Sequence, residues 1–500
     1  MWLIILLLFA LILSIYFFGQ KKINDPVHIV GPPQLPILGN GLLFMNVGAV
    51  EILRQLQKLW HEYGSIYKIF LGSKLWIIVS DPKLIEEIAT NPKFLTKSDD
   101  YDVMEEWLGR GLLTSSGQKW FTHRKALTPA FHFKILETFV PIFDAQSDIL
   151  IRKLEAQSKS GKAFDIFPLI KLYALDVICE TAMGTSCYAQ LEDSAYAKAI
   201  EKISEILNWR VFHALAWNDL YFRMTRKYPE YKKQLQIIYN FTNSVIKSRK
   251  NNLGINNNEI STITKDEDIG MKKKMALLDI LLQTEIDGKL LTNEEIREEV
   301  ESFMFAGHDT TTSAITFLLY NLAKCPEIQE KVYMEISNII GDDKTTKITL
   351  RHLNEMKYFD MVIKESLRMH SPVPFIARRI EDDLLLCDIP LQSGTNIALG
   401  IYLLHHDPKY FPEPEKFLPE RFDINSESEK YANFSYIPFS AGSRNCIGQK
   451  FALNEIKSGA SKVLRNFIVK LPQPDYEPIV KTEIVLKPAN GVYLNFEKRV

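Results

Sequence analysis

The sequence predicts a mainly α-helical protein with small β-sheets, an α+β fold. Most of the middle of the 500-residue chain is predicted to be helical. Residues 66–70 and 75–79 are β-branched and aromatic runs joined by a Gly-Ser pair, which is typical of a β-hairpin. Residues 482–486 and 492–496 alternate around an Asn-Gly pair, which favours a second hairpin.

The N-terminal segment is strongly apolar. Residues 2–18 form an almost unbroken apolar run, close to the ~17–25 residues that span a bilayer. Lys21 and Lys22 follow the run and no positive charge precedes it, so the positive-inside rule leaves the rest of the chain in the cytosol. We therefore expect a transmembrane anchor over residues 1–20. The alternative is a cleaved signal peptide, but a basic leader and a small-residue cleavage site are missing.

Two further segments are polar or stiff. Residues 21–40 begin with basic residues and are rich in proline and glycine, so they are predicted to form a hinge between the anchor and the globular body. Residues 251–273 are rich in Asn, Thr, Lys and Asp and lack apolar periodicity, which predicts an exposed loop.

Composition excludes several classes of protein. With 46% hydrophobic residues the chain can bury a large core, and its net charge of −1 argues against nucleic acid as a partner. The five cysteines are odd in number and have no C-x-x-C spacing, so neither a disulfide framework nor a structural zinc site is predicted, and a reducing compartment fits best.

One cysteine lies in a loop with a distinctive pattern. Residues 439–448 read FSAGSRNCIG and match Phe-x-x-Gly-x-Arg-x-Cys-x-Gly. Five fixed residues at ~5% usage each would coincide in roughly one chain of this length in several thousand. The pattern suits a single thiolate, that of Cys446, bound to haem iron. Taken alone, a cysteine in a glycine turn is more often a buried structural residue, and the flanking residues reverse that preference.

Each fixed position has a physical reason. Phe439 can shield the sulfur, and Gly442 permits a turn with positive φ. Arg444 is placed to reach a haem propionate with its guanidinium. A helix is predicted to begin at Gly448, and its free N–H groups and positive dipole end would stabilise the charge of Cys446.

With this loop the chain resembles the cytochrome P450 superfamily of haem-thiolate monooxygenases, from the anchor to the C-terminal strands. Length alone would suggest two or three domains. The resemblance instead implies the cytochrome P450 fold, with one large catalytic domain over residues 41–500. The proline pattern of the hinge is usual in microsomal members.

A helix predicted over residues 291–323 carries the second motif. A capping box, Thr292-x-x-Glu295, precedes it. Three consecutive threonines lower its helix propensity, so the helix needs another justification. Thr310 can bond the carbonyl one turn back and open a kink, and Asp309 with Thr310 then suits proton delivery to the oxygen being reduced. The alternative is that the threonines only pack in a buried helix.

The family pattern implies that Ala306 and Gly307 border the haem. The longer context, together with residues 176–184, resembles the family 4 branch and its insect members. Most of that branch has glutamate where this chain has Ala306, and that glutamate can form an ester to a haem methyl group. We therefore expect haem b bound by the thiolate of Cys446 and non-covalent contacts only.

Further residues are implied to hold the haem propionates. Trp120 and Arg124 lie one helical turn apart and suit one propionate, although an ordinary amphipathic helix has the same spacing. Arg378 matches the family's strand arginine, and Arg379 beside it is expected to face solvent. Three lysines are expected to form a solvated basic face that would suit an acidic reductase: Lys119, Lys125 and Lys134.

A structural network is implied as well. Glu365 and Arg368 are three apart on a predicted helix, and with Arg421 they match the family's buried Glu-Arg-Arg network, which we assign to fold and haem-pocket integrity. Adjacent His405 and His406 are not expected to bind a metal.

The resemblance implies a monooxygenase in the endoplasmic reticulum membrane. NADPH–cytochrome P450 reductase would supply electrons, with cytochrome b5 as an additional partner, because the chain has no nucleotide-binding fingerprint. Substrates would be lipophilic: fatty acids, terpenoid or steroid hormones, or xenobiotics including insecticides. The segments expected to line the pocket carry no substrate signal: 101–115, 205–225 and 375–380. Alternatives are a peroxide isomerase or dehydratase, against which Asp309 and Thr310 argue, and a haem sensor without turnover.

Overall fold

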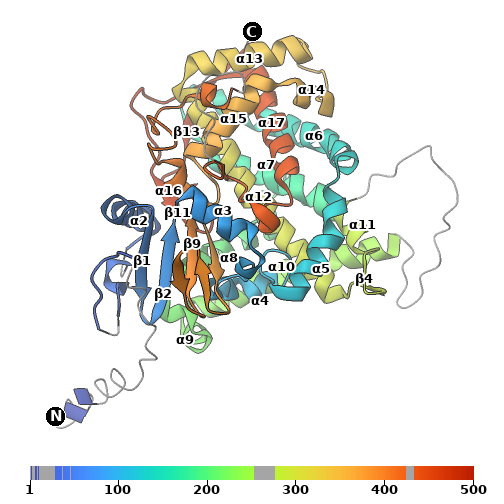
Figure 1. Cartoon of the computed structure of the whole chain (residues 1–500). Helices are drawn as coiled ribbons and strands as arrows, with labels where there is room; N and C mark the ends of the chain where they lie inside the picture. Colours follow the sequence, from blue (N-terminus) through green and yellow to red (C-terminus); the bar gives the residue numbers. More distant parts are fainter. Residues whose placement is uncertain are drawn as a thin grey trace. The chain divides into compact units, whose positions relative to one another are not determined.

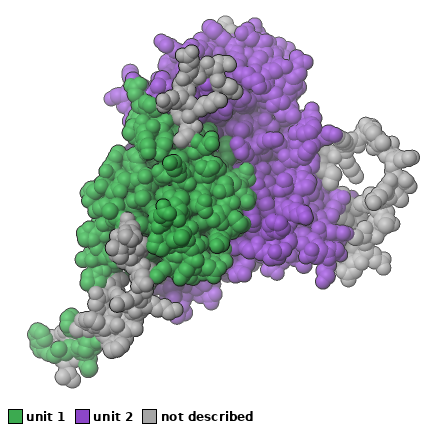
Figure 2. Space-filling view, in the orientation of Figure 1, with its two compact units in different colours: residues 1–99, 373–415, 429–445 green, residues 100–372, 416–428, 446–500 purple. Residues whose placement is uncertain are grey.

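The computed structural model describes residues 2, 6–7, 9–10, 29–36, 38–44, 47–252, 276–423 and 433–499. The chain forms two compact units, each assembled from three segments of sequence (Figure 2). The first unit comprises residues 1–99, 373–415 and 429–445, and the second comprises residues 100–372, 416–428 and 446–500. The predicted class is confirmed, because helices dominate and the sheets are small (Figure 1).

The first unit contains a four-stranded sheet in the order β1-β2-β9-β6. Its strands are β1 (Ile66–Leu71), β2 (Lys74–Val79), β9 (Asn396–Gly400) and β6 (Phe375–Arg379). The predicted first hairpin is confirmed, since β1 and β2 pair antiparallel around Gly72, whose φ is +63°. β2 then runs parallel to β9, and β6 runs antiparallel to β9. Apolar side chains of the central strands, such as Ile77 and Ile397, form a buried core.

Short helices and one hairpin complete the first unit. They are η1 (Gly41–Phe44), α2 (Ala49–Tyr63), α3 (Pro82–Thr90), η2 (Pro92–Phe94), α16 (Ile401–His405), η8 (Gly442–Arg444), β7 (Leu384–Leu386) and β8 (Ile389–Leu391). The described part of the predicted hinge is tied to β1. Lys68 N–H donates to Val30 O over 2.9 Å, and Phe70 N–H donates to Asn40 Oδ1 over 2.8 Å.

The second unit is mostly helical. Its helices are α4 (Glu105–Leu108), α5 (Gly117–Leu127), η4 (Thr128–Phe131), α6 (Phe133–Ser158), α7 (Phe167–Ile178), η5 (Cys179–Met183, a π-helical turn), α8 (Ala195–Phe212), η6 (Ala214–Trp217), α9 (Asp219–Met224), α10 (Lys227–Asn252), α11 (Leu277–Leu281), α12 (Asn293–Lys324), α13 (Pro326–Ile340), α14 (Leu350–Glu355), α15 (Lys357–Met369), η7 (Pro419–Phe422) and α17 (Gln449–Asn466), with η3 (Asp99–Met104) at the boundary of the units.

α12 is the longest of these helices, and its C-terminal half is buried on all sides. It packs against α7, α15 and α17. The predicted capping box is confirmed: the Thr292 hydroxyl oxygen accepts the N–H of Glu295, and the Glu295 carboxylate accepts the N–H of Thr292.

Small sheets border these helices. One has the order β10 (Phe467–Lys470), β13 (Tyr493–Lys498), β3 (Phe164–Asp165); the others pair β11 (Val480–Thr482) with β12 (Leu486–Pro488) and β4 (Glu285–Ile286) with β5 (Lys289–Leu290).

The prediction of a hairpin between residues 482–486 and 492–496 was wrong. The turn lies at residues 483–485, between β11 and β12, while β13 pairs with β10 and β3. Asp165 explains the difference, because its Oδ1 accepts the N–H of Val492 over 2.8 Å and draws that strand to β3.

Two predicted segments lie largely outside the described residues. These are the anchor over residues 1–20 and the loop over residues 251–273, of which only residues 251–252, the end of α10, are described. Within the described part of the chain, no helix combines the length and the apolarity needed to cross a membrane.

Candidate active site

Cys446 lies three residues before Gln449, the first residue of α17. Its side chain is accessible to solvent, and the N–H of Gly448, the N-cap of α17, donates a hydrogen bond to it. Although the side chain is exposed, the protein atoms around it exclude part of the water and raise the pKa of the Cys446 thiol, while Gly448 and Arg124 lower it. A metal ion that binds the sulfur displaces the thiol proton outright. It would therefore favour the thiolate form, as Gly448 and Arg124 already do.

Residues 439–445 of the cysteine loop belong to the first unit. Gly442 has φ +67°, which confirms the predicted positive φ, and a Cβ there would lie 1.7 Å from Ala89 O. The loop can therefore approach α3 this closely only with glycine at this position. Phe439 is half-buried in the same unit.

Three cations gather in the first unit. Arg378 on β6 is 4% exposed, and Arg444 ends η8. Burial, together with the charges of Arg378 and Arg444, lowers the pKa of Lys97 well below its ordinary value. Mutual repulsion of this kind indicates a cluster suited to a dianionic partner. The Arg379 side chain is 43% exposed, and its guanidinium also pairs with the Asp99 carboxylate.

α12 presents a stripe of accessible residues on an otherwise buried surface. Phe303, Ala306, Gly307 and Thr310 are half-buried, and they recur at the spacing of one helical face. Thr310 Oγ1 donates to Ala306 O over 2.7 Å, as predicted. The helix stays α-helical on both sides of this bond, so the expected kink does not interrupt it.

Gly307 has a packing role that the sequence did not indicate. A Cβ at this position would lie 2.7 Å from Cδ1 of Ile178, the last residue of α7. The missing side chain therefore lets α12 and α7 pack closely.

Asp309 is buried beside the stripe. Its Oδ2 lies 2.6 Å from Nζ of Lys487 on β12, and its side chain is 4% exposed. Burial alone would raise the pKa of Asp309, but Lys487, His308 and Lys171 together lower it below its ordinary value. Asp309 is therefore ionised at neutral pH. Burial lowers the pKa of the adjacent His308 to about 3, so that imidazole is neutral.

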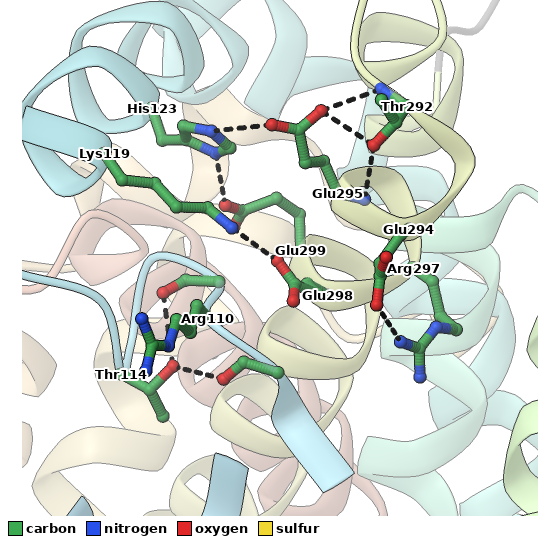
Figure 3. A network of polar contacts seen from close by, with 12 residues as sticks. Arg110, Thr114, Lys119, His123, Thr292, Glu294, Glu295, Arg297, Glu298 and Glu299 are labelled. Carbon is green, nitrogen blue, oxygen red and sulfur yellow. Dashed lines mark hydrogen bonds and ion pairs between the residues drawn. The ribbon is translucent and has the colours of Figure 1, made fainter. Parts of the chain in front are cut away.

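Trp120 and Arg124 both lie on α5. Trp120 is 4% exposed, and Arg124 is half-buried and close enough for its charge to act on Cys446. Figure 3 shows how α5 is fixed to the first turns of α12. Glu299 accepts from His123 Nδ1 over 2.8 Å and from the N–H of Leu112 over 3.0 Å.

One predicted surface charge is paired instead. Lys119 Nζ lies 2.7 Å from Glu298 Oε2, with the two side chains 33% and 11% exposed (Figure 3). The expectation of a solvated face for Lys119 was therefore wrong, whereas Lys125 and Lys134 are exposed.

The structure brings Glu365, Arg368 and Arg421 together in the second unit. Arg421 Nε donates to Glu365 Oε1 over 3.2 Å, and the three side chains are 0%, 0% and 8% exposed. His405 and His406 make separate local bonds, to the N–H of Ile437 and to Tyr402 O. Metal-ligand clusters of His, Cys, Asp or Glu do not occur among the described residues.

The residues of each unit fit haem by their chemistry. The second unit offers an accessible thiol at a helix N-terminus and a half-buried stripe on α12. The first unit offers basic residues suited to carboxylates. These features define a haem-thiolate protein.

The comparisons with known proteins agree. The cytochrome P450 family model matches residues 30–496. Cytochrome P450 4d2 of Drosophila melanogaster is 42% identical over 500 residues, covering 99% of this chain and 98% of that protein. Cytochrome P450 4V2 of Homo sapiens is 40% identical over 468 residues, covering 93% and 88%. The chain therefore belongs to the cytochrome P450 family, and the resemblance to its family 4 branch is confirmed. It is a haem-thiolate monooxygenase.

Sequence reasoning missed three residues of the site: Lys97, Glu299 and Lys487. Each is an ordinary charged residue whose partner is distant in sequence. Only the apolar context of Lys487, within IVLKP, hinted that its charge is buried.

Proposed function

We propose that the enzyme hydroxylates lipophilic substrates with electrons from NADPH, delivered by a separate flavoprotein reductase. The substrate class comprises fatty acids, terpenoid or steroid hormones and xenobiotics including insecticides. In the balanced reaction, a C–H compound, O2, two electrons and two protons yield an alcohol and water. Membership of a monooxygenase family supports this proposal, as does similarity to family 4 relatives in insects and human.

Haem b would be held by the residues that fit it. Cys446 would bind the iron. Trp120 and Arg124 of the second unit have the chemistry to bind its carboxylates, as do Arg378, Arg444 and Lys97 of the first unit. Bound haem supplies a metal centre at which O2 is activated, and the thiolate favours O–O cleavage. Phe439 would shield the sulfur, and Ala306 and Gly307 would border the porphyrin.

Asp309 and Thr310 supply the protons. The Thr310 hydroxyl donates to Ala306 O, so its oxygen keeps its lone pairs to accept hydrogen bonds from water on the accessible face of α12. Asp309 is ionised beside it and can accept a proton and pass it on. The observation that carries this assignment is the adjacency of an ionised buried carboxylate and an accessible hydroxyl on one helix.

The whole proposal is tested with recombinant protein and reductase. The reduced, CO-treated protein should show the long-wavelength Soret band of thiolate ligation, and a screen of fatty acids, terpenoids and insecticides should give NADPH-dependent hydroxylation. Conversion of peroxides without reductase would favour an isomerase or dehydratase. Correct spectra without turnover of any substrate class would favour a sensor.

Haem should not be covalently attached. The methyl side chain of Ala306 cannot form an ester, so haem should leave the polypeptide in acidic organic extraction. Ala306→Glu is the matched variant, since it restores the glutamate usual in this branch, and it should retain part of its haem. Retention by the unmodified chain would overturn the assignment.

We further propose that residues 41–500 act as one catalytic domain, anchored by residues 1–20 to the endoplasmic reticulum membrane. The almost unbroken apolar run over residues 2–18 supports this location. Cell fractionation tests it: the full chain should sediment with microsomes and resist alkaline extraction. Recovery in the soluble fraction would overturn it.

A further inference from the structure

Lys487 is the closest charged partner of Asp309. Its Nζ lies 2.6 Å from Asp309 Oδ2, and the two side chains are 11% and 4% exposed. Asp309 Oδ1 is buried and has no hydrogen-bond partner within the described part of the chain. One carboxylate oxygen is thus fixed by a cation, while the other is open to a small molecule such as water.

The ion pair belongs to a longer polar chain. Lys487 Nζ also lies 3.4 Å from Glu483 Oε2, in the turn between β11 and β12. Asn208 on α8 donates through Nδ2 to the same Glu483 oxygen over 2.5 Å, and its Oδ1 accepts the N–H of Ile484 over 3.3 Å. The position of Lys487 therefore depends on contacts that reach α8.

Other titratable groups also face Asp309. Lys171 on α7 acts on it and pairs with Glu201 on α8, at 3.6 Å. Burial lowers the pKa of Lys171, and Glu201 is 69% exposed, so this cation is a weaker partner than Lys487. His308 is neutral because its pKa is about 3. Removing Lys487 would leave a buried carboxylate with little compensation, and such a group takes up a proton.

We propose that Lys487 is a positioning residue for proton delivery: it keeps Asp309 ionised and oriented, and Glu483 and Asn208 link its position to α8. The inference rests on the proposed role of Asp309. A carboxyl that is already protonated and free to rotate cannot accept the next proton, so electrons would leave as hydrogen peroxide instead of forming water and product.

The test compares Lys487→Met, Lys487→Gln and Lys487→Arg in the full-length holoenzyme with reductase. Lys487→Met should raise the peroxide formed per NADPH several-fold, and Lys487→Arg should restore most of the coupling. Lys487→Gln keeps a hydrogen-bond donor without the charge, so it should behave like Lys487→Met and serves if that variant folds poorly. Lys470→Met is the control, because Lys470 pairs with Glu497 at 2.6 Å but is 51% exposed.

A second readout does not depend on turnover. Infrared spectra at neutral pH should show a new protonated-carboxyl C=O band in Lys487→Met, absent from Lys487→Met combined with Asp309→Asn. Absence of the band would overturn the inference.

The double variant also separates this inference from the proposed function. If Asp309→Asn uncouples the enzyme, Lys487→Met should add no further peroxide in that background, and an additive effect would overturn the inference alone. If Asp309→Asn leaves coupling unchanged, the proposed proton role of Asp309 fails, and the inference with it.

Discussion

Arg368 holds Glu365 through two hydrogen bonds within one turn of α15. Arg368 Nε lies 2.7 Å from Oε2 and Nη2 lies 2.9 Å from Oε1 of Glu365, and neither side chain is exposed. Glu365 Oε1 also accepts from Arg421 and from the N–H of Leu418. The carboxylate thus ties α15 to η7 and the residues before it.

Replacing Arg368 with alanine should abolish haem incorporation. The change removes one of the two arginines that pair with the buried Glu365 carboxylate in the described part of the chain, and breaking such a pair costs about 3–5 kcal/mol. Haem content per mole of purified chain is the measurement. Arg351→Ala is the control, because Arg351 also pairs with a glutamate on its own helix but is 82% exposed. Normal haem content in Arg368→Ala would contradict the structural role.

Replacing Thr310 with alanine should divert electrons to hydrogen peroxide while leaving the CO spectrum unchanged. The hydroxyl is lost from the accessible face of α12, so protons would be delivered less effectively to the dioxygen that is being reduced. Thr312→Ala is a matched control, since Thr312 Oγ1 makes the same bond to the carbonyl one turn back but is fully buried. Peroxide and product per NADPH are measured. Equal coupling in the two variants would refute the proton role of Thr310.

Glu301 should make stability depend on pH. It accepts hydrogen bonds from Trp107 Nε1 and Thr242 Oγ1, and burial raises its pKa to about 7. The folded chain therefore binds a proton more tightly than the unfolded chain, whose glutamate has a pKa of about 4.3. The contribution of Glu301 to the free energy of unfolding is therefore complete below a pH of about 4.3. It is lost as the pH rises to about 7, and the loss is roughly 3 kcal/mol.

Glu301→Gln removes this titration and keeps both hydrogen bonds, because the amide oxygen accepts from Trp107 and the amide nitrogen donates to Thr242. The apparent Tm of the wild type should fall more between pH 5 and pH 8 than that of the variant, at one scan rate. Glu192→Gln, at an exposed position, should follow the wild type. Parallel curves for wild type and Glu301→Gln would contradict the prediction.

Gly442→Ala should prevent formation of the haem-binding loop. Alanine at φ +67° costs about 1–2 kcal/mol, and its Cβ would also overlap Ala89 O. Gly161→Ala isolates the first effect, because Gly161 has φ +66° and nothing within 4 Å of an added Cβ. We expect loss of the CO spectrum for Gly442→Ala and a small loss of Tm for Gly161→Ala. A normal spectrum for Gly442→Ala would contradict the prediction, because it would show that α3 can shift to make room for the added Cβ.

Features encoded by neighbouring residues could be predicted from the sequence. The expected helix over residues 291–323 agrees with α12 to within two residues, because its capping box is local. The hairpin of β1 and β2 follows from a Gly-Ser pair between two apolar runs. The positive φ of Gly442 follows from the spacing within its loop.

Features that depend on distant partners could not be predicted. Lys487 and Asp309 are far apart in sequence, and neither residue type shows which charges it will meet. The second hairpin was misplaced because the Asp165 side chain captures the backbone of Val492, a contact between segments over 300 residues apart. The need for glycine at residue 307 arises from Ile178, which periodicity within α12 cannot reveal.

The parallel pairing of β2 with β9 has a consequence for biosynthesis. Val79 lies opposite Leu399, so the two partners are separated by more than 300 residues of chain. At about 5–20 residues per second, a ribosome needs roughly 15–60 seconds to make the second partner after the first. During that time the apolar edge of β2, LWIIV, has no neighbour on one side and is prone to aggregation. Protection of this edge until β9 has been made would therefore reduce the risk of aggregation.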